Sequence, residues 1–205
     1  MSTRITVARE SLWQHTRTAV LMVIVLTVLL GIVYPLAMTG LSQLIFPGQA
    51  NGSLVRDSAG NVVGSALLGQ NFSNPEYFHP RPSAAGTDGY DATSSGGSNL
   101  GPTNQKLIDT ARDRAAAYRE ENGLAAEAPV PVDAVTASAS GLDPDISPAN
   151  ALIQAGRVAK ARNLTEDQVR SLVNQNTEGR TLGILGEPRV NVLQLNRALD
   201  AASHP

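Results

Sequence analysis

The sequence predicts a single N-terminal transmembrane α-helix followed by a mixed α+β extracytoplasmic domain. Two observations support this: no charged side chain occurs between Arg17 and Arg56, and the polar remainder alternates short strand-like runs with longer helical patterns. A helix of about 20 residues crosses the ~30 Å hydrocarbon core of a bilayer, and the uncharged interval is longer than that. We divide the chain into a cytoplasmic tail (1–17), a transmembrane helix (18–41) and an extracytoplasmic α+β domain (47–205).

The composition excludes several classes of protein. The chain has 205 residues, a net charge of −2 and no cysteine, which excludes disulfide frameworks, thiolate zinc sites, iron–sulfur clusters and cysteine nucleophiles. Glycine and proline, at 18 and 12 residues, are too few for a collagen-like or low-complexity chain. The slight acidity argues against a nucleic-acid partner, which favours a basic surface.

The apolar segment has two alternative interpretations, a core helix of a soluble protein and a cleaved signal peptide. Residues 19–34 are apolar apart from Thr27, Gly31 and the Tyr34 hydroxyl, and core helices rarely stay uncharged over such a length. A signal peptide has a shorter apolar core and a small-x-small cleavage site soon after it. Because residues 36–38 make a poor cleavage site, we favour an uncleaved signal anchor.

The charges beside this segment predict its orientation. Arg4, Arg9 and Arg17 precede the helix and only Glu10 opposes them. Since arginine is enriched on the cytoplasmic side of membrane helices, the N-terminus is expected in the cytoplasm. Residues 51–205 then lie outside, with 13 basic and 17 acidic side chains and a net charge of −4.

Small residues recur along the predicted membrane helix. Thr27, Gly31, Pro35 and Thr39 stand four residues apart and give the helix one small side. Small side chains let helix backbones approach closely in lipid, which favours packing against a helix of another subunit. Threonine and glycine are also common in membrane helices without such a partner, so both interpretations stay open.

The outer domain begins with a hairpin and an irregular segment. Residues 54–56 and 61–63 flank a turn at 57–60, which predicts two antiparallel strands. Residues 71–102 are dense in Gly, Ser, Pro, Asn and Asp and show no periodicity. This segment is either disordered or an ordered functional loop. In the second case its aromatic side chains would hold it in place, namely Tyr77, Phe78 and Tyr90.

Capping signals predict the later elements. A strand-like run and four helices follow the irregular segment, and three of the helices carry a recognisable end. We expect a helix over 103–122 closed by Gly123, a strand over 130–137, a helix from the Ser147-Pro148 cap to about 161, a helix from the Thr165…Gln168 capping box to about 174, and a last helix over 191–201.

The sequence carries no recognisable catalytic or metal-ligating pattern. No two of His15, His79 and His204 have the spacing of zinc ligands. His79 could be the general base of an anchored envelope hydrolase, although an isolated histidine is more typical of a structural hydrogen bond. Lys106 and Lys160 lack the glycines of a phosphate-binding loop. An anchored module that binds peptide or glycan through the irregular segment is a further alternative.

Six blocks of sequence resemble one protein family. They are GSALLGQNF (64–72), YFHPRPSA (77–84), SGGSNLGPTN (95–104), VTASASGLDP (135–144), RVAKARNL (157–164) and GEPRVNVL (186–193). In this order they are similar to the C subunit of the Kdp potassium-transporting ATPase, from the membrane helix nearly to the C-terminus.

The resemblance implies an accessory subunit of a high-affinity potassium pump in a bacterial plasma (inner) membrane. Potassium would be the transported ion of the complex. The implied partners are a P-type ATP-hydrolysing subunit, a channel-like potassium-translocating subunit, a candidate small single-helix subunit and the lipid bilayer. P-type ATPases are phosphorylated in an Asp-Lys-Thr-Gly-Thr motif, which this chain lacks, so hydrolysis is expected of a partner.

Two roles are compatible with the resemblance. The outer domain could cap the side from which potassium enters, or the subunit could be a catalytic chaperone that raises the ATP affinity of the hydrolysing subunit in a ternary complex with ATP. The predicted orientation favours the first, because cytoplasmic ATP lies on the other side of the membrane. The resemblance marks fourteen residues without assigning their roles: Gln70, Asn71, Phe72, His79, Arg81, Ser95, Gly96, Gly97, Ser98, Asn99, Asp143, Arg157, Glu187 and Arg189.

Overall fold

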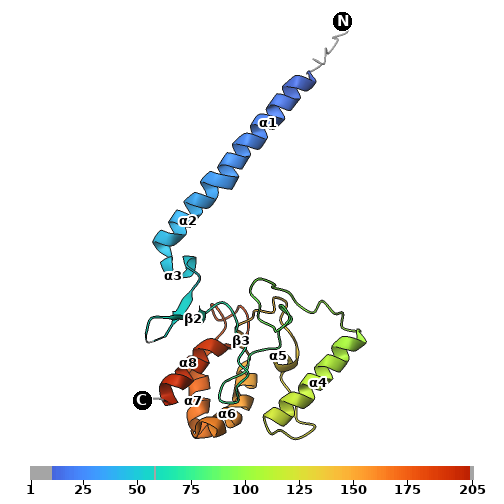
Figure 1. The fold of residues 1–205 in the computed structure, drawn as a ribbon, viewed down its shortest axis with the longest axis vertical. Coiled ribbons are helices and arrows are strands. Elements are labelled where there is room, and N and C mark those ends of the chain that lie inside the picture. Colours follow the sequence, from blue (N-terminus) through green and yellow to red (C-terminus); the bar gives the residue numbers. More distant parts are fainter. Residues whose placement is uncertain (1–10, 58, 204–205) are drawn as a thin grey trace. The chain divides into compact units, whose positions relative to one another are not determined.

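The computed structural model describes residues 11–57 and 59–203 of the chain, which divides into two compact units at Ser53 and Leu54 (Figure 1). Arg4, Arg9 and Glu10, on which the orientation prediction partly depends, lie outside the described residues, as does His204. The two units are described separately below.

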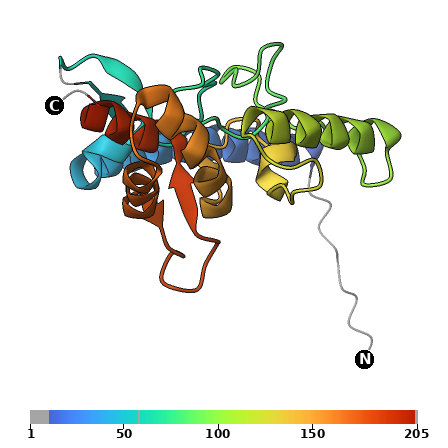
Figure 2. The same ribbon diagram turned by 90° about the horizontal axis from the view of Figure 1, so that it is seen from below.

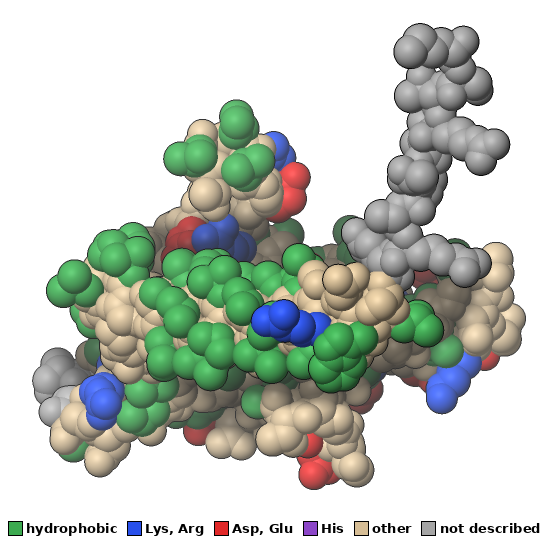
Figure 3. Space-filling model, turned by 90° about the horizontal axis from the view of Figure 1, so that it is seen from above, with side chains coloured by type: hydrophobic (Ala, Val, Ile, Leu, Met, Phe, Trp, Pro, Cys, Tyr) green, Lys and Arg blue, Asp and Glu red, His purple; other side chains and the backbone are tan. Residues whose placement is uncertain are grey.

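The first unit is a long apolar helix. It consists of α1 (Leu12–Val28), a π-helical turn η1 (Leu29–Val33) and α2 (Tyr34–Ile45), with the short α3 (Pro47–Ala50) after it. These first three elements form one helix of 34 residues, the single candidate membrane span among the described residues. Hydrophobic side chains gather along it, and none of its residues is buried (Figure 3). The predicted span 18–41 lies within this helix, which is long enough to cross a bilayer.

The π-helical turn lies directly before a proline. The N–H of Tyr34 donates to the carbonyl of Leu29, five residues earlier. Pro35 has no N–H, and a proline ring crowds the carbonyl four residues before it, here that of Gly31. A wider turn relieves this crowding without ending the helix. A Cβ on Gly31 would lie 3.9 Å from the Thr27 methyl, an ordinary contact, so the helix itself does not require glycine there.

The second unit begins with the predicted hairpin. Strands β1 (Leu54–Arg56) and β2 (Val62–Ser65) pair antiparallel, with a register shift after Val55. The carboxylate of Asp57 accepts hydrogen bonds from the backbone N–H of Asn61 at 2.8 Å and from its side-chain amide at 3.1 Å. These bonds fix the turn, as expected for an aspartate at this position.

The four predicted helices are confirmed, and the end that was predicted for three of them is the one observed. They are α4 (Gln105–Glu121), α6 (Pro148–Arg162), α7 (Glu166–Gln175) and α8 (Val192–Ser203). Ser147 accepts from the N–H of Asn150, and Thr165 and Gln168 form the capping box. Gly123, just after α4, has a φ of +64°, the left-handed conformation that favours glycine after a helix.

The predicted strand over 130–137 is wrong. Residues Val132–Val135 form the short helix α5, with Pro131 as its N-cap residue. The carboxylate of Asp133 accepts from the N–H of Ser147 at 2.7 Å and from its hydroxyl at 2.9 Å. This tertiary contact holds Asp133 at the start of α6, where the helix dipole favours a negative charge, and it overrides the strand preference of the valines.

A small sheet was not predicted. Strands β3 (Asp145–Ile146), β4 (Thr177–Glu178) and β5 (Arg189–Asn191) are antiparallel in the order β3-β5-β4. Helices α6, α7 and α8 lie side by side next to this sheet, and α4 lies toward the other end of the unit (Figures 1 and 2). The core comprises buried residues of these three helices, the sheet and one residue of the irregular segment, namely Phe78, Ile146, Ala151, Ala155, Val158, Ala159, Val169, Val173, Val190, Val192, Leu195 and Leu199.

Candidate functional site

The segment 71–102 is fixed to the core by two buried amide side chains. Asn196 of α8 accepts from the N–H of Phe78 at 2.8 Å and donates to its carbonyl at 3.0 Å. Likewise, Gln154 of α6 accepts from the N–H of His79 at 2.7 Å and donates to its carbonyl at 3.1 Å. Each amide therefore replaces the partner that a neighbouring strand would supply, and no buried backbone group of these two residues lacks a partner. Of the two alternatives for this segment, an ordered loop is therefore the one observed, while its function stays a prediction.

The three aromatic residues that were predicted to hold the segment, Tyr77, Phe78 and Tyr90, all do so. Phe78 is fully buried in the core. The ring of Tyr77 lies under the guanidinium of Arg162, 4.7 Å from the ring centroid. The hydroxyl of Tyr90 donates to the carbonyl of Arg81 at 2.7 Å. The aromatic side chains thus hold the segment at three different points.

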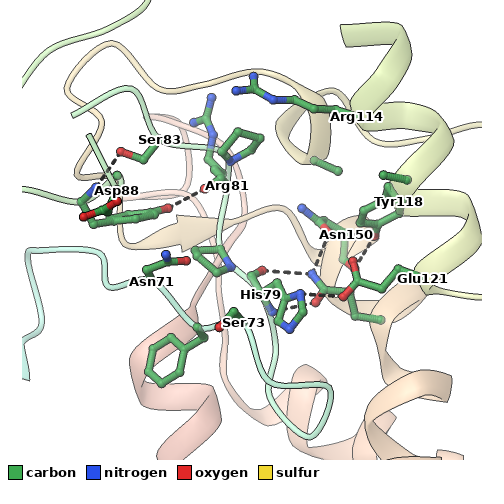
Figure 4. Close-up of a pocket in the computed structure, with 18 residues that line it drawn as sticks. Asn71, Ser73, His79, Arg81, Ser83, Asp88, Arg114, Tyr118, Glu121 and Asn150 are labelled. Atoms are coloured by element: carbon green, nitrogen blue, oxygen red, sulfur yellow. Dashed lines mark hydrogen bonds and ion pairs between the residues drawn. The ribbon is translucent and has the colours of Figure 1, made fainter. Parts of the chain in front are cut away.

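A cavity of about 350 Å³ lies between this segment and helices α4 and α6 (Figure 4). Four of the residues marked by the family resemblance line it, namely Asn71, Phe72, His79 and Arg81. Helix α4 contributes Arg114, Tyr118 and Glu121 from the opposite wall. The walls of the cavity therefore carry charged groups of both signs.

His79 joins the segment to α4. Its Nδ1 lies 2.7 Å from Oε1 of Glu121, and its Nε2 lies 2.9 Å from the carbonyl oxygen of Asn74. The hydrogen bond from His79 lowers the pKa of Glu121 against the effect of burial, and the charges of His79 and Arg157 lower it further. Because both ring nitrogens already contact acceptors, this geometry suits a structural connection better than a general base, which needs a nitrogen free for the substrate.

Arg157 of α6 also contacts both the segment and Glu121. Its Nη1 donates to the carbonyls of Pro75 and Tyr77 at 2.6 and 3.0 Å, and its Nη2 donates to Gln154 at 2.8 Å. Its Nε lies 3.7 Å from Oε1 of Glu121. Burial lowers the pKa of this guanidinium, yet an arginine starts so high that it stays charged. Arg157 therefore supplies a positive charge that is held against the segment by these hydrogen bonds.

Arg81 pairs with Asp143 at the other end of the cavity. Its Nε is the one buried side-chain polar atom without a hydrogen-bond partner among the described residues. Gly69 passes close by: a Cβ there would lie 2.4 Å from the Tyr90 ring and 2.6 Å from the carbonyl oxygen of Asp143. Close packing therefore requires the second glycine of the GSALLGQNF block, Gly69.

The Ser/Gly run at 95–99 lies away from the cavity, against residues 138–141. The N–H of Gly96 and the hydroxyl of Ser95 both donate to the carbonyl of Ser140 at 2.9 Å. A Cβ on Gly97 would lie 3.0 Å from the carbonyl oxygen of Ala139. The run thus packs as a turn, with Asn99 in the left-handed conformation and Ser98 beside a separate surface hollow.

The remaining marked residues stabilise the edges of the strands. Gln70 donates to the carbonyl of Val63 at 2.7 Å. Arg189 contacts Glu178 at 2.6 Å and Asp145 at 3.3 Å, and Glu187 pairs with Arg180 at 2.7 Å. The fourteen marked residues therefore do not form a single site.

Sequence analysis missed the residues that α4 and α6 bring to the cavity. Positions 114, 117, 118 and 121 follow the spacing of one helix face, so the predicted helix already placed Glu121 beside Tyr118. The apolar residues of the same face make it resemble an ordinary core-facing helix face. Asn150 and Gln154 stand four residues apart in α6 and are bonded to each other at 2.9 Å, but nothing local to the sequence shows that they are buried.

No group of three or more His, Asp and Glu residues within the described ranges is placed to hold a metal ion. The polar groups around the cavity instead bond to one another. Tyr118 donates to Asn150 at 2.8 Å, and Asn150 donates to Asp133 at 3.0 Å. The arrangement is a hydrogen-bonded network that holds the segment, α4 and α6 in fixed positions.

Comparison with known proteins gives a consistent family. Residues 16–201 match the family model described as KdpC, the c chain of the K+-transporting ATPase. The chain is 58% identical over 192 residues to the potassium-transporting ATPase KdpC subunit of Caulobacter vibrioides strain NA1000 / CB15N, covering 93% of this chain and 95% of that one. It is 59% identical over 182 residues to the KdpC subunit of Mycobacterium tuberculosis H37Rv, covering 89% and 95%. It is 56% identical over 184 residues to that of Koribacter versatilis Ellin345, covering 89% and 92%.

Proposed function

The chain belongs to the KdpC family, the c chains of the K+-transporting ATPase, and on this premise we propose that it is an accessory subunit that does not itself hydrolyse ATP. Members of the family are subunits of a multi-subunit complex that transports potassium. The sequence lacks the Asp-Lys-Thr-Gly-Thr motif in which P-type ATPases are phosphorylated, which supports a separate hydrolysing partner. The proposed partners are that P-type subunit, a channel-like potassium-translocating subunit and a small single-helix subunit.

The observation that carries the proposal is the division of the chain into an exposed apolar helix and a folded polar unit. The helix Leu12–Ile45 contains one charged residue, Arg17, near its N-terminal end, and the next charge along the chain is Arg56. We propose that the helix crosses a bacterial plasma (inner) membrane once, with the N-terminus in the cytoplasm and the second unit outside.

In this orientation the second unit would cap the side from which potassium enters. Its net charge of −4 has the sign that enriches cations locally. Screening over ~8–10 Å at physiological salt makes that contribution small, so the unit would act mainly by organising the partner subunits. Its hydrogen-bonded segment 71–102 gives it the fixed shape that such a role requires.

Co-purification tests the accessory role. A tag on this chain, purified from membranes in mild detergent, should retain a P-type hydrolysing subunit and a channel-like subunit; a chain that is purified alone contradicts the proposal. Within the helix, Gly31→Leu fills the small side at Thr27, Gly31, Pro35 and Thr39 and should reduce this retention. Gly40→Leu is the matched control, because Gly40 has open space around it and lies outside the small side.

Protease treatment of intact spheroplasts tests the orientation. We expect the second unit to be digested from outside while the N-terminal tail stays protected. A second unit that becomes accessible only after lysis would place it beside cytoplasmic ATP. That result would overturn the capping role and favour the catalytic chaperone that raises the ATP affinity of the hydrolysing subunit.

His79→Ala separates these roles from the envelope-hydrolase alternative. In the proposed role His79 connects the segment to Glu121, so the variant should lose stability and weaken retention of the partners. A hydrolase of the cell envelope would instead lose an activity that the purified chain has without any partner. Measuring both properties on the same preparation distinguishes the two.

A further inference from the structure

The connection between β4 and β5 carries an exposed apolar tip, which we define as residues 181–185. Leu182, Ile184 and Leu185 are 85%, 74% and 56% exposed. Figure 2 shows this orange-red connection projecting from the second unit, and in Figure 3 it is the projection at the top of the view, with hydrophobic side chains at its outer end. Three large apolar side chains in water at one place usually mark a contact with another molecule.

Backbone hydrogen bonds hold the apolar tip in one conformation. Thr181 and Leu185 exchange N–H to carbonyl bonds, both of 2.9 Å, and the N–H of Gly183 donates to Arg180 at 3.0 Å. Below the turn, the guanidinium of Arg180 contacts both carboxylate oxygens of Glu187, at 2.8 and 2.7 Å. The side chains are therefore presented on a closed turn, so little conformational entropy is lost when a partner binds them.

Leu182 occupies a backbone conformation that leucine avoids. Its φ is +54°, in the left-handed region, where a residue other than glycine, asparagine or aspartate costs about 1 kcal/mol or more. The backbone conformation closes the turn, but the leucine side chain itself gains no burial in return, because it is almost fully exposed. Strained backbone of this kind concentrates at functional positions.

The charges around the apolar tip argue against a lipid surface as its occupant. Between residues 179 and 188 the charged residues are Arg180 and Glu187, which pair with each other. Loops that enter a bilayer interface typically carry unpaired lysine or arginine for anionic headgroups and Trp or Tyr at headgroup depth. A rigid apolar anchor whose neighbouring charges pair with each other instead fits the core of a protein–protein interface, which is depleted in charged residues.

We propose that the apolar tip docks into an apolar pocket on another protein subunit of the potassium-transporting ATPase complex. This inference rests on the proposed accessory role, to which it adds contact residues and the chemistry of the partner surface. It is independent of the orientation in the membrane and of the cavity beside His79.

The cysteine-free sequence makes the test direct. Leu182→Cys places a single thiol on the tip of the full chain, and Ile184→Cys provides a second position. The rate of maleimide labelling is measured on this chain in three preparations: alone in detergent, alone in lipid vesicles, and in the purified complex. Val132→Cys is the matched control, since Val132 is 73% exposed and lies outside the tip.

We expect fast labelling of both tip thiols in detergent and in vesicles, at least tenfold slower labelling in the complex, and no comparable slowing at the control position. Equal labelling of the tip in all three preparations would overturn the docking role, while co-purification of the partners would still support the accessory role. If the tip thiols already label slowly in vesicles without partners, lipid is the occupant of the tip, and this result would also overturn the docking role. Loss of the complex with a tip variant but not with Val132→Cys would support the docking role, whereas failure of the unsubstituted chain to form a complex would contradict the accessory role.

Discussion

The segment 71–102 and the apolar tip are both irregular chain, yet they relate to the rest of the second unit in opposite ways. The segment buries Phe78 completely and forms hydrogen bonds with α6 and α8. Within the part of the chain that the structure describes, the tip instead bonds inside its own turn, and it exposes Leu182. The difference teaches that length and composition do not define a loop's role. What matters is which groups satisfy its backbone and where its apolar side chains lie.

The largest effect should come from removing an amide that holds the segment. Asn196→Leu leaves the N–H and carbonyl of Phe78 buried without partners, and each such group costs about 1–3 kcal/mol, so we expect a loss of about 4 kcal/mol in unfolding free energy. Urea unfolding of the detergent-solubilised chain measures it. The control Gln194→Leu changes an exposed position of the same helix and should stay within about 0.5 kcal/mol. Equal midpoints for the two variants would show that the segment does not depend on this amide.

A smaller loss is expected where two parts of the unit approach closely. Gly141→Ala would bring a Cβ within 2.6 Å of Cβ of Ala85 and 2.8 Å of the carbonyl oxygen of Gly96, at a φ of +67°. Gly123→Ala has nearly the same φ, +64°, with open space around it. Both should lose about 1 kcal/mol from backbone strain, and Gly141→Ala about 2 kcal/mol more from steric conflict. Thermal unfolding of the pair isolates the packing contribution; similar melting temperatures would contradict it.

The contact between Glu121 and His79 should make the anchoring of the segment pH-dependent. The pKa of Glu121 is lower in the folded chain than its ordinary value, so its stabilisation is complete above that ordinary value and is lost as the pH falls through the folded-state pKa. At neutral pH we expect Glu121→Gln to lose about 1 kcal/mol, because solvent screens this partly exposed carboxylate. Urea unfolding between pH 7 and pH 3 should show the difference from the natural chain shrinking in acid. Glu120→Gln, at an exposed neighbouring position, should show no such trend.

The smallest effect on stability belongs to the apolar tip. Leu182→Asn removes an exposed side chain and places at a φ of +54° a residue that tolerates it, so stability should be unchanged or rise by up to about 1 kcal/mol. The same variant should reduce retention of the partner subunits. A marked destabilisation would instead make the tip part of the fold, and would remove the contrast with the segment 71–102.

Sequence patterns predicted those elements whose signals are local. The caps at Ser147 and Thr165 act within four residues, so they marked the starts of α6 and α7 correctly. Strands β3, β4 and β5 have only two or three residues each, too few for an alternating pattern, and depend on pairing between distant parts of the chain.

The candidate site was predictable only in part, for the same reason. The resemblance marked His79 and Arg81, which line the cavity, but also marked Glu187 and Arg189, which lie on the hairpin formed by β4 and β5. Glu121 became part of the site through the packing of α4 against the segment. That packing is a tertiary contact that no local spacing encodes.

The amide of Asn196 also constrains the order in which the chain can mature. It joins two positions 118 residues apart, and the amide of Gln154 joins two positions 75 apart. A chain made from its N-terminus exposes the segment 71–102 long before α8 has been synthesised, and closing such long loops is slow. The anchoring of the segment at Phe78 must therefore wait for the last helix, and until then Phe78 is open to proteases and to chaperones. A truncation that removes α8 would thus first release Phe78, more than a hundred residues upstream.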